Sequence, residues 1–281
     1  MHSNPLLNPV EKKPASVPSF FSENKGIRTS MKVTIITVTY NSGDHLKECI
    51  LSVQHQLYKN IEHIIIDGKS TDNTINIIKE HEAGIAHWIS ETDRGMYDAI
   101  NKGLDMATGD IVGILNSDDI LEDETVIESI VHTFEKEQVD TVYGDLQYVL
   151  KADINKVVRI WKGQPYKRSR FLIGWMPAHP TFYIKRSLLE HYGKYESHYF
   201  TASDYEFMAR YLFRHHLTAH YIPKLIVRMR VGGQSNSSIK QRFRANRRDY
   251  LAMKKNNIPF PFMVSILKPL IKLHQFVTKV Y

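Results

Sequence analysis

The chain has 281 residues, of which 42% are apolar, so it is long enough to bury a sizeable core. Its single cysteine, Cys49, excludes an intrachain disulfide framework. The net charge of +7 is compatible with anionic substrates or an anionic membrane surface. No run of about 18 apolar residues occurs, so no transmembrane helix is expected.

The first thirty residues contain four prolines and lack the apolar core of a signal peptide. We therefore expect residues 1–30 to be a disordered extension, with Met31 opening the folded part.

Strand and helix signals alternate between residues 31 and 120. Apolar or β-branched runs predict strands at 33–39, 61–67, 87–90 and 111–115, and helical spacing predicts helices at 43–54, 70–79 and 96–106 between them. This alternation favours a parallel sheet wrapped by helices, in which ligands bind at the carboxyl ends of the strands.

The second half is less regular. Strands are predicted at 141–148, 156–161 and 219–227, a loop with a strand at 171–183, helices at 205–216 and 239–255, and a turn at Gly232–Gly233. We expect a domain over 31–238 with two halves, 31–120 and 121–238. A basic, amphipathic tail follows at 239–281.

Asp118 and Asp119 stand at the end of the apolar run 111–115. Two adjacent carboxylates repel each other unless a cation or hydrogen-bond donors compensate them. A hard divalent ion such as Mg²⁺ takes carboxylate oxygens and often substrate phosphates. The alternative is that these acids cap a helix near Glu124.

Two other strand ends carry polar residues that are, taken singly, ordinary. Asp67 precedes Gly68 and could be a turn residue. Tyr40 and Asn41 could likewise be a simple strand exit. Three polar clusters at one edge of a sheet nevertheless make a site more probable than any one of them alone.

The segment 90–103 concentrates polar side chains in a loop and a helix start. Tyr97 and Asn101 are four residues apart and so share a helical face, which a solvated surface rarely needs. Asp98 suits a helix N-terminus, and Arg94 suits a diphosphate or a base.

Several segments in order resemble family 2 glycosyltransferases of the non-processive bacterial type that builds surface polysaccharides. The matching segments are 37–41 (TVTYN), 66–74 (IDGKSTDNT), 90–103, 115–119 (LNSDD), 175–182 (WMPAHPTF), 203–206 (SDYE) and 232–235 (GGQS). The resemblance implies a GT-A-like α/β fold, with a mixed sheet, a Rossmann-like nucleotide-binding half and helices on both faces.

The resemblance also implies a nucleotide-diphosphate sugar as donor and a divalent metal, Mn²⁺ or Mg²⁺, as cofactor. Residues 31–120 would be the nucleotide-sugar-binding half and residues 121–238 the acceptor half. Asp119 would be the direct metal ligand, with Asp118 a ribose contact and a second candidate ligand. The other residues implied to contact the nucleotide sugar are Thr39, Tyr40, Asn41, Asp67, Asp93 and Arg94.

Asp204 matches the catalytic base of the family, which would take a proton from the acceptor hydroxyl in an inverting displacement. Glu206 is the close alternative, and Asp204 could instead cap the helix that follows. His179 could contact the acceptor or diphosphate, or simply pack beside Trp175.

The pattern departs from the family at Asn116, where many relatives have an acid, and this leaves the ligand assignment open. The Gln-x-x-Arg-Trp motif of processive synthases is absent. A sugar nucleotidyltransferase, or a non-catalytic polysaccharide-binding relative, is the alternative.

We expect a cytoplasmic protein whose acceptor is a glycan or a lipid-linked oligosaccharide. The basic residues of 240–255 predict either a solvated face or peripheral docking on anionic lipid, aided by apolar residues after Pro259. Nucleic acid is not an expected partner, because the basic cluster lies apart from the acidic pair.

Overall fold

The computed structural model describes residues 30–232 and 239–273. The described residues from 31 to 232 and from 239 to 273 form one compact unit. The predicted extension therefore lies outside the described residues except for Ser30, and so does Gly233 of the predicted turn. The boundary placed at residue 239 stays a prediction.

Nine strands of the described part form one mixed sheet in the order β3-β2-β1-β4-β8-β6-β9-β5, with β7 paired to β6. Their bounds are β1 Val33–Thr39, β2 Ile61–Asp67, β3 His87–Ser90, β4 Ile111–Ile114, β5 Ile120–Leu121, β6 Thr141–Leu150, β7 Asp153–Trp161, β8 Tyr183–Lys185 and β9 Ala219–Arg230. The first four strands in this order are parallel, whereas β8 runs antiparallel to β4 and β6. The mixed α/β sheet is the one predicted.

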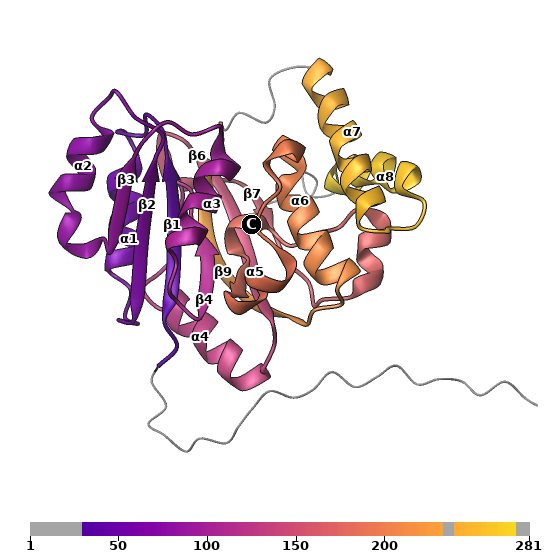
Figure 1. Cartoon of the computed structure of the whole chain (residues 1–281), viewed down its shortest axis with the longest axis horizontal. Coiled ribbons are helices and arrows are strands. Elements are labelled where there is room, and N and C mark those ends of the chain that lie inside the picture. Colours follow the sequence, from indigo (N-terminus) through magenta and orange to yellow (C-terminus); the bar gives the residue numbers. More distant parts are fainter. Residues whose placement is uncertain (1–29, 233–238, 274–281) are drawn as a thin grey trace, which may run out of the picture. The chain divides into compact units, whose positions relative to one another are not determined.

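Helices cover both faces of this sheet (Figure 1). The helices are α1 Leu46–Gln54, α2 Thr74–Glu80, α3 Met96–Met106, α4 Val126–Glu137, α5 Ser187–Tyr192, α6 Ser203–Met208, α7 Ile239–Lys255 and α8 Pro261–Leu273. Shorter helical segments are η1 Glu82–Gly84, η2 Arg168–Ile173, η3 His179–Thr181, η4 Ser197–Ala202 and the π-helical η5 Ala209–Arg214.

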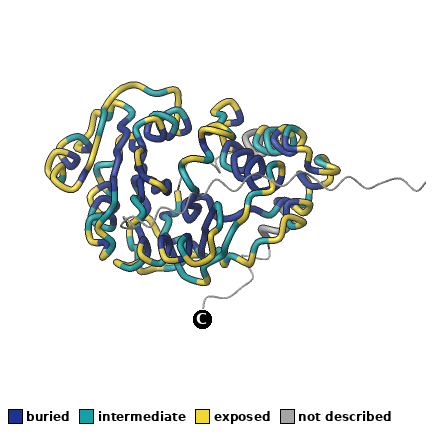
Figure 2. The backbone as a smooth tube through the Cα atoms, turned by 60° about the horizontal axis from the view of Figure 1, so that its bottom comes forward, coloured by how far each residue is buried: buried dark blue, intermediate teal, exposed yellow. Residues whose placement is uncertain are grey.

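Alternate side chains of strand β1 pack against helices on opposite faces of the sheet. Ile36 and Val38 pack with α3, whereas Val33 and Ile35 pack with residues of α1 and α4. All seven residues of β1 are buried, because helices lie on both sides (Figure 2). The polar side chains that follow this strand therefore emerge at the edge of the sheet, where a ligand can reach them.

Close packing also fixes Gly113 in β4. A Cβ atom there would lie 2.2 Å from the Tyr183 ring of the neighbouring strand β8. The short strand β4, which precedes the acidic pair, is thereby packed closely against β8 in the second half of the chain.

Two structural alternatives from the sequence are wrong. Asp118 and Asp119 do not cap a helix, because β5 follows them and α4 begins only at Val126. Asp204 is not the N-cap of α6, because the helix begins one residue earlier and Ala202 is the cap. The predicted helix at 205–216 is also two segments, α6 and η5.

Candidate active site

Three strand ends meet at the carboxyl edge of the parallel strands. Thr39 of β1 is paired with Asp67 of β2, and Asp67 is paired with Ser90 of β3. Thr39 is buried and its hydroxyl has no hydrogen-bond partner within the described residues. An unsatisfied buried hydroxyl at a strand end is available to a ligand.

The Asp67 carboxylate is fully buried and held as an acceptor by its neighbours. Ser90 Oγ donates to Asp67 Oδ2 over 2.6 Å, and the Ser70 backbone amide donates to the same oxygen over 2.9 Å. The Ser70 hydroxyl donates to Oδ1. Hydrogen bonds of this number compensate the buried carboxylate for lost water and fix its position.

Tyr40 and Asn41 follow β1 directly and lie at the same carboxyl edge of the sheet. The Asn41 side-chain oxygen accepts from the Thr71 amide over 2.8 Å, and its backbone has a φ of 48°. Tyr40 is exposed and its ring lies beside Gly68, where a Cβ would be 3.4 Å from the Tyr40 ring. That Cβ would also lie 2.7 Å from Asp93 Oδ2, so Gly68 permits the close approach of Asp93.

Arg94 is placed differently from its neighbours. Its side chain is 87% exposed and pairs with Asp98 over 2.7 Å, four residues along the chain. Asp93 instead accepts from the Gly95 amide over 2.8 Å, which turns the loop into α3. The structure therefore brings Thr39, Tyr40, Asn41, Asp67 and Asp93 together and leaves Arg94 on the surface beside them.

The acidic pair joins this rim through a serine contact. Ser42, just after Asn41, lies with its hydroxyl 2.8 Å from the Ser117 hydroxyl. Asp119 is fully buried; its Oδ2 accepts from Asn116 Nδ2 over 2.8 Å, while its Oδ1 has no partner within the described residues. Burial, and then the neighbouring Asp118 carboxylate, raises the pKa of Asp119 well above its usual range.

Arg230 is a site residue that sequence reasoning missed. It is buried at the end of β9, donates from Nη1 to the Asp118 carbonyl over 2.6 Å, and pairs through Nη2 with Glu48 of α1. Only the fold places a residue more than a hundred positions away beside the acidic pair, so no local signal could have found it.

The acidic pair fits a divalent cation. A buried carboxylate oxygen without a partner, next to a second carboxylate, is a costly arrangement that a hard cation would relieve. Residues 30–232 and 239–273 contain no cluster of three His, Cys, Asp or Glu side chains arranged for a metal. A metal at such a pair usually takes further ligands from water and substrate phosphates.

Asp204 lies in the first turn of α6 and is partly exposed. Its charge affects the pKa of several aromatic or imidazole groups, His179 among them. Burial lowers the pKa of His179 and Asp204 opposes this; burial raises the pKa of Tyr97 and of Tyr195, and Asp204 adds to both.

Glu206 occupies a buried ion-pair network. Its carboxylate is fully buried, 2.9 Å from Arg210 Nη2 and 3.0 Å from Lys255 Nζ. Arg210 in turn donates to the carbonyls of Gly193 (3.0 Å) and Lys194 (2.7 Å). A fully buried carboxylate paired with two cations has no open face for a substrate.

His179 is buried and hydrogen-bonded rather than free. Its Nε2 lies 2.7 Å from the Tyr195 hydroxyl, and the Tyr195 ring stacks on Tyr97 at 5.6 Å and on Phe207 at 4.1 Å. Asn101 bonds both backbone polar groups of Tyr195. The shared face predicted for Tyr97 and Asn101 is therefore the face that carries Tyr195.

Tyr148 of β6 lies under the guanidinium of Arg159, whose Cζ is 4.0 Å from the ring centroid. Burial raises the pKa of Tyr148, and the Arg159 guanidinium opposes this rise.

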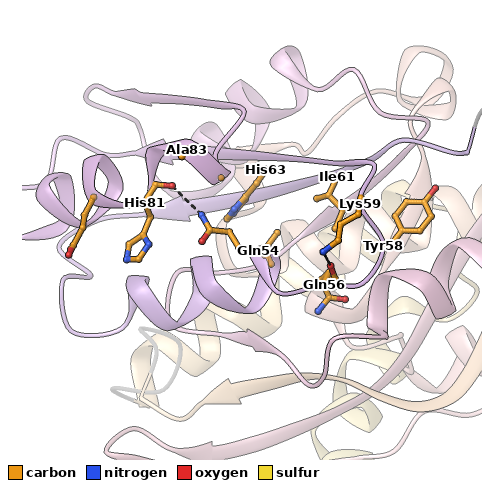
Figure 3. Close-up of a pocket in the computed structure, with 11 residues that line it drawn as sticks. Gln54, Gln56, Tyr58, Lys59, Ile61, His63, His81 and Ala83 are labelled. Carbon is orange, nitrogen blue, oxygen red and sulfur yellow. Dashed lines mark hydrogen bonds between the residues drawn. The ribbon is translucent and has the colours of Figure 1, made fainter.

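The hollow in Figure 3 is a different place. It has a volume of about 430 Å³ and is lined by residues that include Gln54, His63 and His81. Ile61 and His63 lie at the start of β2, so this hollow is at the amino end of the parallel strands, away from the polar rim.

Comparison with known proteins assigns the family. Residues 34–193 match the model of glycosyl transferase family 2. The chain is 32% identical over 182 residues to an uncharacterized glycosyltransferase of Mycobacterium tuberculosis, covering 63% of this chain and 68% of the relative. It is 28% identical over 215 residues to a PGL/p-HBAD biosynthesis glycosyltransferase of Mycobacterium bovis, covering 75% and 81%. The chain belongs to glycosyl transferase family 2.

Solved structures agree on the fold. TarS of S. aureus in complex with UDP-GlcNAc superposes with a TM-score of 0.63 at 17% identity, covering 89% of this chain and 74% of TarS. The mannosyltransferase PcManGT of Pyrobaculum calidifontis, in complex with GDP-Man and Mn²⁺, gives 0.62 at 20% identity, covering 88% and 72%. The fold is the GT-A fold of glycosyltransferases, as the sequence predicts.

No helix of the described residues has the length and apolar character needed to cross a membrane.

Proposed function

We propose that this glycosyltransferase moves a sugar from a nucleotide-diphosphate sugar, a UDP-sugar, to a hydroxyl of a glycan or lipid-linked acceptor, with inversion at the anomeric carbon. The acceptor belongs to cell-surface glycan synthesis, such as capsule, exopolysaccharide or O-antigen. The observation that carries the proposal is the polar rim of Thr39, Asp67 and the buried Asp119, which the Ser42–Ser117 hydroxyl contact joins.

In this proposal the nucleotide lies along the carboxyl edge. Asp67 is held as an acceptor and suits ribose or base N–H and O–H donors. Tyr40 offers an exposed ring for the base, beside Gly68 and Asp93. Asn41 and Arg94 stay candidate contacts of the nucleotide sugar. Asn41 shapes the loop through its bond with Thr71, and Arg94 would have to leave its ion pair with Asp98.

Asp119, with Asp118, would hold a divalent cation, Mn²⁺ or Mg²⁺, which when bound would neutralise charge on the leaving diphosphate. Asp118 is also a candidate ribose contact. Asn116 and Arg230 keep the pair in place, the first through Asp119 Oδ2 and the second through the Asp118 carbonyl.

Asp204 is the proposed base. It takes the proton from the acceptor hydroxyl while that oxygen attacks the anomeric carbon, and the bond from this carbon to the diphosphate oxygen breaks on the opposite face. The electron pair of that bond leaves with the nucleotide diphosphate. Glu206 is not proposed for this role because its buried carboxylate is already paired with Arg210 and Lys255.

The support from relatives is by analogy. TarS was solved with UDP-GlcNAc and PcManGT with GDP-Man and Mn²⁺, and another relative is named for PGL/p-HBAD biosynthesis. Family membership and the acidic rim favour sugar transfer over a nucleotidyltransferase or a non-catalytic binding protein. We further propose a cytoplasmic location with peripheral membrane association.

Nucleotide release from UDP-, GDP- and dTDP-sugars, with Mn²⁺ and with EDTA, tests the proposal. We expect metal-dependent release from a UDP-sugar and, once an acceptor is found, an inverted anomeric configuration by NMR. Release that is unchanged by EDTA would contradict the metal role, and a retained configuration would contradict the single displacement.

A further inference from the structure

Helix α8 and the turn before it expose apolar side chains in an unusual concentration. The exposed fractions are 73% for Phe260, 70% for Phe262, 54% for Met263 and 46% for Ile266. Phe262, Met263 and Ile266 lie on one face of α8, while Val264, Ser265 and Lys268 on the other face are buried. The helix is therefore already docked by its inner face, and its outer apolar face needs another explanation.

The segment η2 packs against the inner face of α8 and also exposes apolar side chains. Leu172 and Ile173 are 40% and 44% exposed. The end of η2 packs against α8, since a Cβ at Gly174 would lie 2.6 Å from the Lys268 Cβ. We call Phe260, Phe262, Met263 and Ile266 the apolar patch.

Helix α7 adds positive charge next to the patch. Arg244, Arg247, Leu251 and Lys254 are exposed and recur at the spacing of one helical face, and α7 packs on α8 (Figure 1). Arg244, Arg247 and Lys254 form no ion pair with any described residue, whereas the acidic Asp249 is already paired with Lys268 at 2.6 Å. Arg248, Leu251 and Lys254 also line an open hollow with His198 and Tyr199.

The charge of the whole chain is concentrated here. Residues 239–273 contain nine Lys or Arg and one acidic residue, a net charge of +8. The whole chain carries +7, so the remainder carries −1. Positive charge beside protruding aromatic and aliphatic tips is complementary to an anionic bilayer surface, where apolar tips enter the headgroup boundary and cations meet lipid phosphates.

We infer that α7, α8 and the apolar patch form a docking surface for an anionic membrane. This inference rests on the proposed function for its purpose, since a lipid-linked acceptor would be presented at the same surface. Helix α7 packs on α6 and η4, the segments that carry and precede Asp204, so docking would bring the acceptor half to the bilayer.

Flotation of the full chain with vesicles of phosphatidylcholine, with and without phosphatidylglycerol, tests this surface. The charge variant is Arg244→Glu, Arg247→Glu, Lys254→Glu, and the apolar variant is Phe260→Ser, Phe262→Ser, Met263→Ser. Matched controls change exposed residues elsewhere: Lys79→Glu, Lys136→Glu, Lys156→Glu for charge, and Leu57→Ser, Val158→Ser for apolar area.

We expect the wild type and both controls to float with anionic vesicles and not with neutral ones. Each patch variant should lose about tenfold or more of the bound fraction. Absence of wild-type binding, or binding by the patch variants equal to the wild type, would overturn the inference. The wild type could instead be a dimer that does not bind vesicles. If the apolar variant is then a monomer, the patch would be assigned to contact with a second copy of the chain.

Nucleotide release without vesicles separates this inference from the proposed function. The patch variants should keep wild-type release from the donor, because they lie outside the nucleotide rim. Loss of flotation with normal release supports the docking surface. Normal flotation in a protein that releases no nucleotide would instead leave docking intact and contradict the proposed transfer.

Discussion

Asn101 of α3 holds Tyr195 by both of its backbone polar groups. Asn101 Nδ2 donates to the Tyr195 carbonyl over 2.8 Å, and the Tyr195 amide donates to Asn101 Oδ1 over 3.0 Å. This pair joins the nucleotide half to the acceptor half across 94 positions of sequence. Tyr195 also forms a hydrogen bond with His179, so the contact extends to a second buried side chain of the acceptor half.

Replacing Asn101 with Ala should loosen this junction. The loss of two hydrogen bonds should lower the free energy of unfolding by about 2 kcal/mol. We also expect a higher KM for the acceptor with donor binding kept, because Tyr195 positions His179 on the acceptor side. Urea unfolding and steady-state kinetics measure these, with Asn76→Ala on α2 as the exposed control. An unchanged acceptor KM would show that the junction is structural only.

Replacing Asp204 with Asn removes the proposed base while keeping the shape of the side chain. Turnover should fall by about 10²–10⁴-fold, the usual contribution of general-base catalysis. The Kd for the nucleotide should stay near the wild-type value, because Asp204 lies on α6 and not on the nucleotide rim. Rapid-quench transfer and nucleotide titration measure the two separately. Near-normal turnover would remove Asp204 from the mechanism.

Glu206 should behave as a stabilising residue. Glu206→Gln leaves the buried Arg210 without its charge partner, and breaking a buried pair costs about 3–5 kcal/mol. Glu190→Gln is the matched control, since Glu190 pairs with Arg186 at the surface and should change stability by less than about 1 kcal/mol. Thermal and urea unfolding compare the two. Lost turnover in a Glu206→Gln protein of unchanged stability would contradict the structural role.

The strand ends are predictable because their signals are local. The bounds of β1, β2 and β3 follow from β-branched and apolar runs, so the amino-acid pattern alone places Thr39, Asp67 and Ser90 at one edge of the sheet. The partners of these residues are not predictable in this way. Arg230 reaches the acidic pair, and Glu206 meets Lys255, only because β9 and α7 fold back over long sequence separations.

The antiparallel strand β8 shows the same limit. Its three residues pair with β4 and β6, and no periodicity can be read from so short a strand. The sequence allows Asp204 to be either a helix cap or a catalytic base. The structure excludes the helix cap, because α6 begins at Ser203. The chemical role of Asp204 stays a prediction.

His63 should make stability depend on pH. It is buried at the start of β2, with Nε2 3.0 Å from Thr37 Oγ1, and burial lowers the pKa of His63 from 6.5 to about 4. Between these values the unfolded chain binds more protons than the folded chain, so the free energy of unfolding rises with pH across this window. The contribution of His63 is fully present above pH 6.5 and is lost as the pH falls towards 4, up to about 3 kcal/mol.

Urea unfolding of wild type and His63→Gln at pH 7 and pH 5 measures this dependence. The Gln side chain keeps a polar group for Thr37 but does not titrate, so the difference between the two pH values should shrink. His132→Gln, at an exposed position on α4, is the control and should keep the wild-type difference. An equal pH dependence in His63→Gln would assign the effect to other groups.

Calorimetric titration of UDP, GDP and dTDP, each with Mn²⁺ and with EDTA, tests the central claim most directly. We predict that UDP binds with Mn²⁺, that EDTA weakens this binding, and that Asp119→Asn weakens it by about tenfold or more. The same variant should fold normally without ligand, because it removes a buried carboxylate with an unpartnered oxygen. Absence of nucleotide binding with metal present, or binding by Asp119→Asn equal to the wild type, would contradict the account.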